Sequence, residues 1–93
     1  MRAEASRLAN EMAGRFPFRR LYLFGSVADG RPLSVWSDMD LAVEGLPPGR
    51  FLELAGALAA ASSHTVDLKP LEELAGDRRR RIALEGVLIY ERD

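Results

Sequence analysis

Apolar and polar residues repeat along the chain with two different periods. Residues 3–16 and 50–61 place apolar side chains three and four positions apart, which predicts two amphipathic helices. Residues 38–43 and 64–68 alternate between polar and apolar side chains, which predicts two strands with one face buried. Two short apolar runs, residues 21–24 and 87–90, are typical of buried strands. These periods alone indicate a chain that mixes helices with strands.

The remaining segments predict shorter elements and one long loop. Pro70 stands where the first position of a helix over residues 70–74 is expected. Asp77 is expected to cap a further helix over residues 78–85. Residues 25–37 form a long loop, a kind of segment that often carries function in small domains. The order helix, strand, strand, helix, strand, helix, strand predicts an α/β (α+β) fold, a small mixed sheet with helices packed on it.

Composition narrows the class of protein. The 93 residues suit one domain over residues 1–93, and a net charge of -1 argues against a general nucleic-acid binder. The absence of cysteine excludes disulfides and thiolate chemistry, and one histidine cannot form a multi-histidine metal site. No apolar run approaches the roughly 20 residues of a membrane span. The first residues lack an apolar signal-peptide segment, so we expect a cytoplasmic protein with no membrane contact.

Three aspartates occupy predicted strands, where this residue type is depleted. Asp38 and Asp40 are two positions apart, so their carboxylates point to the same face, and Asp67 lies in another strand. If the two strands are neighbours, the three carboxylates converge. Two carboxylates about 4 Å apart repel by roughly 1 kcal/mol in water and about 4 kcal/mol at an effective dielectric of 20. A cation would relieve this repulsion, and an all-carboxylate site suits Mg²⁺ or Mn²⁺ together with substrate phosphates.

Gly25 and Ser26 end the first predicted strand and open the long loop. Glycine lets a phosphate approach the backbone closely, and a serine at a helix N-terminus favours anions. Taken alone, a Gly-Ser pair is more often a plain turn. Each aspartate also has an ordinary interpretation: Asp38 as a turn residue, and Asp67 as the partner of Lys69 or an arginine.

The motifs Phe24-Gly25-Ser26, Ser37-Asp38-Met39-Asp40-Leu41 and Val66-Asp67-Leu68 occur in this order. In this order they resemble the minimal nucleotidyltransferases of the DNA polymerase beta superfamily. The resemblance extends from Leu21 to Leu68, and we expect it to continue to Tyr90 and so to cover most of the chain. Many members carry an arginine soon after the Gly-Ser pair, whereas here the nearest base is Arg31.

The resemblance implies a role for each motif residue. Gly25 and Ser26 would bind the triphosphate of ATP, with Ser37 and Arg31 as further nucleotide-binding residues. Asp38 and Asp40 would hold Mg²⁺, and Asp67 would share a metal and help to deprotonate the attacking hydroxyl. Two metals would stabilise the attacking and leaving oxygens of an in-line displacement.

The resemblance also implies a partner. We expect transfer of a nucleoside monophosphate, AMP from ATP, to a tyrosine of a HEPN toxin, so that the chain acts as an antitoxin. Two other functions remain open: a binding module that neutralises a partner by contact, and a modifier of small molecules. A small core and an open sheet are also compatible with a homodimer or a partner bound through a helix.

Four further features have ordinary interpretations. Trp36 either packs in the core or stacks on a base. His64 is expected at a strand edge, and Tyr22 and Tyr90 within strands. The run Arg78-Arg79-Arg80-Arg81 is most simply a solvated helix face, with a partner-binding patch as the alternative.

Overall fold

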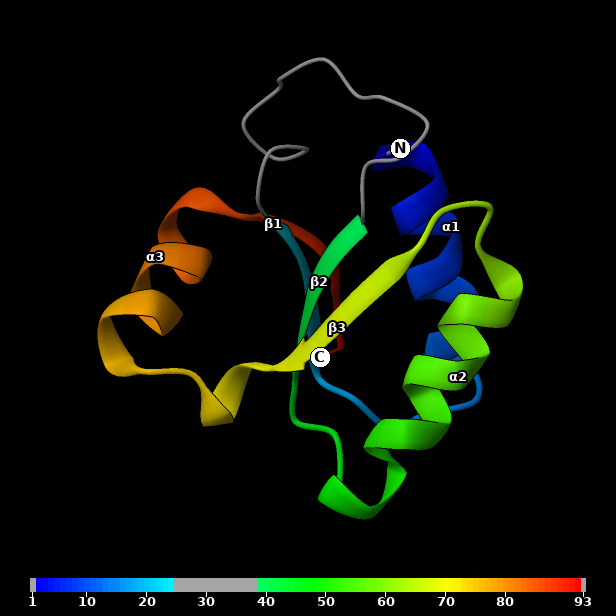
Figure 1. Ribbon diagram of the computed structural model, residues 1–93, viewed down its shortest axis with the longest axis horizontal. Helices are drawn as coiled ribbons and strands as arrows, with labels where there is room; N and C mark the ends of the chain where they lie inside the picture. Colours follow the sequence, from blue (N-terminus) through cyan, green and yellow to red (C-terminus); the bar gives the residue numbers. More distant parts are fainter. Residues whose placement is uncertain (1, 25–38, 93) are drawn as a thin grey trace.

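A computed structural model describes residues 2–24 and 39–92, which form a four-stranded sheet with helices on both faces (Figure 1). The helices are α1 (Arg2–Ala13), α2 (Phe51–Ala61) and α3 (Gly76–Glu85). The strands are β1 (Arg20–Phe24), β2 (Met39–Glu44), β3 (Val66–Pro70) and β4 (Val87–Glu91). Two short 3-10 turns are also present: η1 (Pro48–Arg50) precedes α2, and η2 (Leu71–Glu73) follows β3. The mixed α/β prediction and its order of helices and strands are confirmed.

The sheet has the strand order β3-β2-β1-β4. β1 pairs antiparallel with both β2 and β4, whereas β2 and β3 are parallel. A parallel pair needs a crossover connection, and α2 provides it between β2 and β3. Within the described residues, no helix is long and apolar enough to cross a lipid bilayer.

The main core lies between one face of the sheet and the pair α1 and α2 (Figure 1). Met39, Leu41 and Val43 point from β2 into this core and are almost fully buried, as the alternating pattern predicts. Leu8 of α1 and Leu58 of α2 pack onto them with no exposed surface. This packing makes β2 a rigid element from which a polar side chain can project on the opposite face.

α3 covers part of that opposite face. Ile82 of α3 forms a second, smaller cluster with Ala42 and Leu71, and Tyr22 and Phe24 pack against it. Ala42, which the alternation placed on the polar side of its strand, is therefore completely buried. The period-two pattern could not show this burial, because it depends on α3 packing over the second face.

Helix α1 ends earlier than its apolar pattern predicts. It ends at Ala13 rather than residue 16, yet Phe16 is only 3% exposed. The residue before a proline avoids helical geometry, so Pro17 disfavours a helical Phe16. Phe16 instead packs into the core from a turn in which its N–H donates to the carbonyl of Met12 at 2.8 Å.

Three other boundaries also differ from the sequence prediction. β3 begins at Val66 rather than residue 64, so His64 lies in a bend before the strand and not at its edge. Pro70 is the last residue of β3, and a 3-10 turn follows it where residues 70–74 were expected to open a helix. The N-cap of α3 is Ala75, so Asp77 lies inside the first turn of the helix rather than capping it. There a carboxylate still interacts favourably with the helix dipole.

Candidate active site

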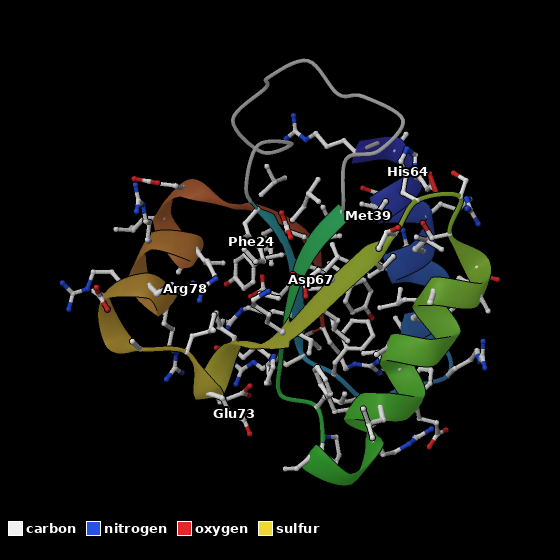
Figure 2. All side chains as sticks on the ribbon, viewed as in Figure 1. Phe24, Met39, His64, Asp67, Glu73 and Arg78 are labelled. Carbon is white, nitrogen blue, oxygen red and sulfur yellow. The ribbon has the colours of Figure 1, made fainter. Side chains whose placement is uncertain are left out.

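Asp40 and Asp67 are neighbours across the parallel pair β2 and β3. The strand register pairs the two residues directly, so their Cα atoms are separated by about one strand spacing, roughly 4.8 Å. Their chain neighbours Leu41 and Leu68 pack in the main core, so both carboxylates lie on the face that carries α3. Asp40 is half-buried, and the side chain of Asp67 is 46% exposed. Figure 2 shows Asp67 on β3, close to the neighbouring strand β2. The predicted proximity of these two acids is therefore present.

The two described segments that flank residues 25–38 meet at the same end of the sheet. Phe24, the last residue of β1, is the register partner of Asp40. The Gly25-Ser26 motif follows Phe24 directly in the sequence, and Asp38 directly precedes Met39. The predicted roles of Gly25, Ser26, Arg31, Ser37, Trp36 and Asp38 all fall on residues outside the described ranges and stay predictions.

Asp67 has a cationic partner. Nζ of Lys69 lies 2.6 Å from Oδ2 of Asp67, and both side chains are partly exposed. The two residues are two positions apart in β3, so strand geometry places them on one face. The ion pair that sequence analysis offered as the ordinary interpretation of Asp67 is thus present. Such exposed pairs stabilise a fold by 0 to about 1 kcal/mol, so the pair leaves Asp67 accessible to other ligands.

The described residues supply two of the three carboxylates predicted to hold a metal ion. Asp40 and Asp67 offer hard carboxylate oxygens side by side, the ligand type that Mg²⁺ and Mn²⁺ prefer. Among residues 2–24 and 39–92, however, no three histidine, cysteine, aspartate or glutamate side chains gather closely enough to hold a metal ion. The donor set therefore fits such an ion, and the third predicted ligand, Asp38, lies outside these residues.

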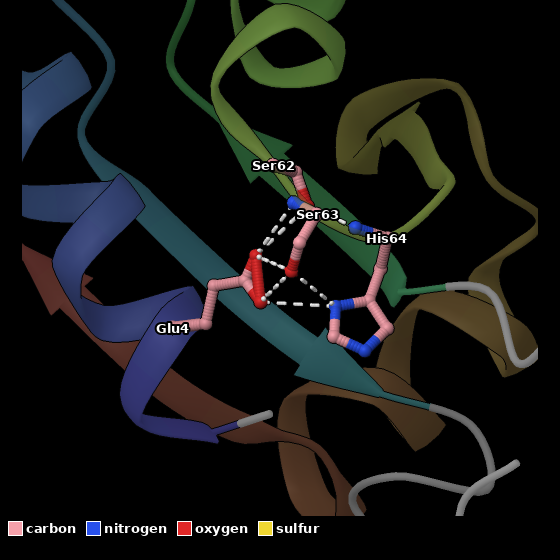
Figure 3. Close-up of polar contacts among 4 residues, drawn as sticks. All are labelled: Glu4, Ser62, Ser63 and His64. Carbon is pink, nitrogen blue, oxygen red and sulfur yellow. Dashed lines mark hydrogen bonds and ion pairs between the residues drawn. The ribbon is translucent and has the colours of Figure 1, made fainter. Parts of the chain in front are cut away.

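A cluster that sequence analysis missed ties α1 to the segment before β3 (Figure 3). Glu4 accepts hydrogen bonds from the Ser63 backbone N–H at 2.9 Å and from the hydroxyl groups of Ser63 and Ser62. Nδ1 of His64 lies 2.9 Å from Oε1 of Glu4. Glu4 is about sixty positions away from Ser62, Ser63 and His64 in the chain, so no local sequence pattern pairs them. The sequence showed only that Glu4 is an acidic residue in the first turn of a predicted helix.

These hydrogen bonds hold the Glu4 carboxylate in its charged form. Donation from the Ser63 backbone N–H is the largest influence, and it lowers the pKa of Glu4 from 4.5 to about 2 against the opposing effect of desolvation. The cluster fixes the bend just before β3. Because Thr65 then accepts a hydrogen bond from the N–H of Met39 at 2.7 Å, this bend sits at the start of the β2–β3 pairing that carries both acids.

Two other surface features lie apart from the paired acids. All four arginines from Arg78 to Arg81 are exposed, as expected for a solvated helix face, and Arg81 pairs with Glu85 of its own helix. A pocket of about 440 Å³ includes Val43 and Pro70 in its lining. These residues lie at the C-terminal ends of β2 and β3, so this pocket is at the opposite end of both strands from Asp40 and Asp67.

Comparison with known proteins places this geometry in a family. The model of the family "Polymerase beta, Nucleotidyltransferase" matches residues 7–93 of the chain. The chain belongs to the polymerase beta nucleotidyltransferase family. It is thus a nucleotidyltransferase, and the resemblance noted in the motifs is confirmed. No curated protein matches the chain.

Solved structures agree with the family assignment. A chain of a toxin–antitoxin complex with AMP-PNP has a TM-score of 0.74 and 26% identity, with 99% of this chain and 74% of that chain covered. A protein proposed to be a minimal nucleotidyltransferase has a TM-score of 0.68 and 28% identity, with 92% and 89% covered. The complex of a tri-AMPylated HEPN toxin from Shewanella oneidensis with its MNT antitoxin has a TM-score of 0.71 and 24% identity, with 99% and 74% covered; at this identity it shows the fold alone.

Proposed function

We propose that the chain is an Mg²⁺-dependent protein adenylyltransferase that moves AMP from ATP to a tyrosine hydroxyl of a HEPN-like toxin and so acts as its antitoxin. The observation that carries this proposal is the direct pairing of Asp40 with Asp67 in the sheet of a nucleotidyltransferase fold, where Asp67 is accessible to solvent. The toxin–antitoxin neighbour with AMP-PNP supports the choice of an adenine nucleotide and of a toxin as partner, and the resemblance of the motifs supports a HEPN-like toxin.

The reaction is an in-line displacement at the α-phosphorus. A bond forms between the acceptor oxygen and this phosphorus, the bond to the β-phosphate oxygen breaks, and pyrophosphate leaves. Asp67, partly exposed at the sheet edge, accepts the proton of the acceptor hydroxyl. Asp40 and Asp67, with Asp38, would hold the metal ions, which would neutralise charge on the phosphates. Gly25 and Ser26, with Ser37 and Arg31, bind the triphosphate.

A label-transfer assay tests the proposal. The purified chain is mixed with Mg²⁺, ATP labelled at the α-phosphate and the HEPN-like protein encoded by a neighbouring gene. Label is expected on the partner. Asp40→Asn and Asp67→Asn should each lower the rate by at least about 100-fold, equivalent to roughly 2.7 kcal/mol of transition-state stabilisation. Asp77→Asn, the same change at an exposed position on α3, should leave the rate within about twofold of the wild type.

A different result would identify the alternative function. If none of the four nucleotides transfers label and the two proteins still form a tight complex, the chain neutralises its partner by contact. Survival of inhibition in Asp67→Asn would support the same conclusion. Transfer to an aminoglycoside without a protein partner would instead identify a modifier of small molecules.

A further inference from the structure

Lys69 is the only lysine of the chain, and it is directed at a predicted metal ligand. Its Nζ donates to Oδ2 of Asp67 at 2.6 Å, and its side chain is 27% exposed. The parallel register places Lys69 opposite Ala42, one step along the same face from the pair of acids. The contact therefore follows from the backbone of β3 rather than from a chance arrangement of a long surface side chain.

An ammonium group and a divalent cation compete for the same carboxylate oxygens. The ammonium at Oδ2 neutralises Asp67 while no metal is bound. A divalent cation that binds this oxygen must displace the lysine, and it also experiences repulsion from a positive charge a few ångströms away. Metal binding to an aspartate without a neighbouring ammonium group would not carry this cost.

We propose that Lys69 is the resident counter-ion of Asp67, that it competes with the catalytic metal for this carboxylate, and that it thereby keeps the affinity of the nucleotide-free protein for divalent cations low. The inference rests on the proposed metal-dependent function. Lys69 acts as a positioning residue through Asp67. Because Lys69 competes with the metal in this way, the metal binds tightly only when nucleotide phosphates contribute further ligands.

Metal binding to the full-length chain without nucleotide tests this inference. Mn²⁺ is titrated into wild type and Lys69→Met, and the free ion is followed by electron paramagnetic resonance. Lys69→Met should bind Mn²⁺ about 3- to 10-fold more tightly, because the competing charge is gone while the side-chain length is kept. Lys69→Arg restores a cation and should bind within about twofold of the wild type.

Two controls separate a local competition from a general change in charge. Arg80→Met removes the same charge from an exposed position on α3 and should leave Mn²⁺ affinity unchanged. In an Asp67→Asn background, Lys69→Met should have no further effect, because the two substitutions act on one interaction. Thermal melting of each variant in EDTA confirms that it folds.

The outcomes distinguish failure of this inference from failure of the proposed function. If Mn²⁺ binding depends on Asp67 but Lys69→Met binds no more tightly than the wild type, Lys69 is not a competitor and the metal site stands. If Lys69→Met binds Mn²⁺ no more tightly than the wild type because neither binds it, the inference is overturned. If, in addition, the wild type transfers no label to its partner with Mg²⁺ and ATP, the metal-dependent function is overturned as well.

Discussion

At the scale of single residues, Asp40 and Asp67 differ in the side chains and strands that surround them. Asp67 faces Lys69 along its own strand and Asp40 across the sheet. Asp40 lies on the inner strand β2, between β1 and β3, and pairs with Phe24 on its other side, whereas Asp67 lies on the edge strand β3. Two identical residue types thus occupy different surroundings in the sheet.

One glycine near these strands is required by backbone geometry. Gly45 follows β2 with a φ of 84°, and a Cβ placed there would lie 2.7 Å from Cβ of Arg19. Its N–H also donates to Oε2 of Glu72 at 2.7 Å. Gly45→Ala should therefore lower the free energy of unfolding by about 1–3 kcal/mol, measured by urea denaturation.

Gly49 provides the matched control for that substitution. A Cβ at Gly49 meets no atom within 4 Å, and its φ is not positive. Gly49→Ala should change stability by less than about 0.5 kcal/mol. Equal effects of the two substitutions would show that the conformation at Gly45 imposes no special requirement.

At the scale of elements, a polar contact and an apolar core together position the strands of the site. α1 and α2 bury one face of the sheet, and Glu4 of α1 accepts hydrogen bonds from the bend that leads into β3. This contact joins the beginning of the first helix to the strand that carries Asp67. The helix therefore contributes to site geometry without touching the acids.

The Glu4 cluster predicts a pH dependence of stability. The pKa of Glu4 is lowered from 4.5 to about 2 in the folded chain, mainly by the Ser63 backbone N–H. A carboxyl with a depressed folded pKa stabilises the fold at pH values above 4.5, and this stabilisation is lost as the pH falls from about 4.5 to about 2. At pH 7, Glu4→Gln should lower the free energy of unfolding by roughly 1 kcal/mol.

Urea denaturation of wild type and Glu4→Gln across this pH range measures the effect. The difference between the two proteins should shrink steadily below pH 4.5 and be small near pH 2. Glu11→Gln, which loses only an exposed pair with Arg7 on the same helix, should have a smaller effect at pH 7. A Glu4→Gln difference that is independent of pH would contradict the charged hydrogen-bond cluster.

At the scale of the whole molecule, the proposed function predicts a linkage between ligand binding and stability. A ligand at 100 times its Kd stabilises the folded state by about 2.7 kcal/mol. For a chain of this size, that corresponds to a rise in Tm of roughly 10–20 °C. Mg²⁺ with a non-hydrolysable ATP analogue should therefore raise the Tm of the wild type, as measured by scanning calorimetry.

The same measurement on Asp67→Asn and in EDTA provides the comparison. The rise in Tm should be smaller for the variant and smaller for the wild type when the metal is removed, because the metal links the carboxylates to the phosphates. An equal rise in all three experiments would show that the nucleotide binds without these acids.

Much of the fold could be predicted because it depends on local periodicity. The spacing of Leu8 and Met12 determines a helical face, and the alternation around Leu41 determines which side of β2 enters the core. The motifs also indicated the family, because their residue types and their order are properties of the sequence alone. Element ends such as Ala13 were less predictable, because Phe16 belongs to the core without belonging to the helix.

The sequence by itself thus determined the types of element, their order and the residues able to carry the chemistry. The tertiary structure decided which residues meet: Asp40 with Asp67 through the parallel register, and Glu4, which no motif indicated, with Ser63 through helix packing. It also decided that Ala42 is buried under α3 and that His64 lies before β3 rather than within it. Periodicity reports only which face of an element is apolar, whereas these contacts depend on how separate elements pack, which no local spacing encodes.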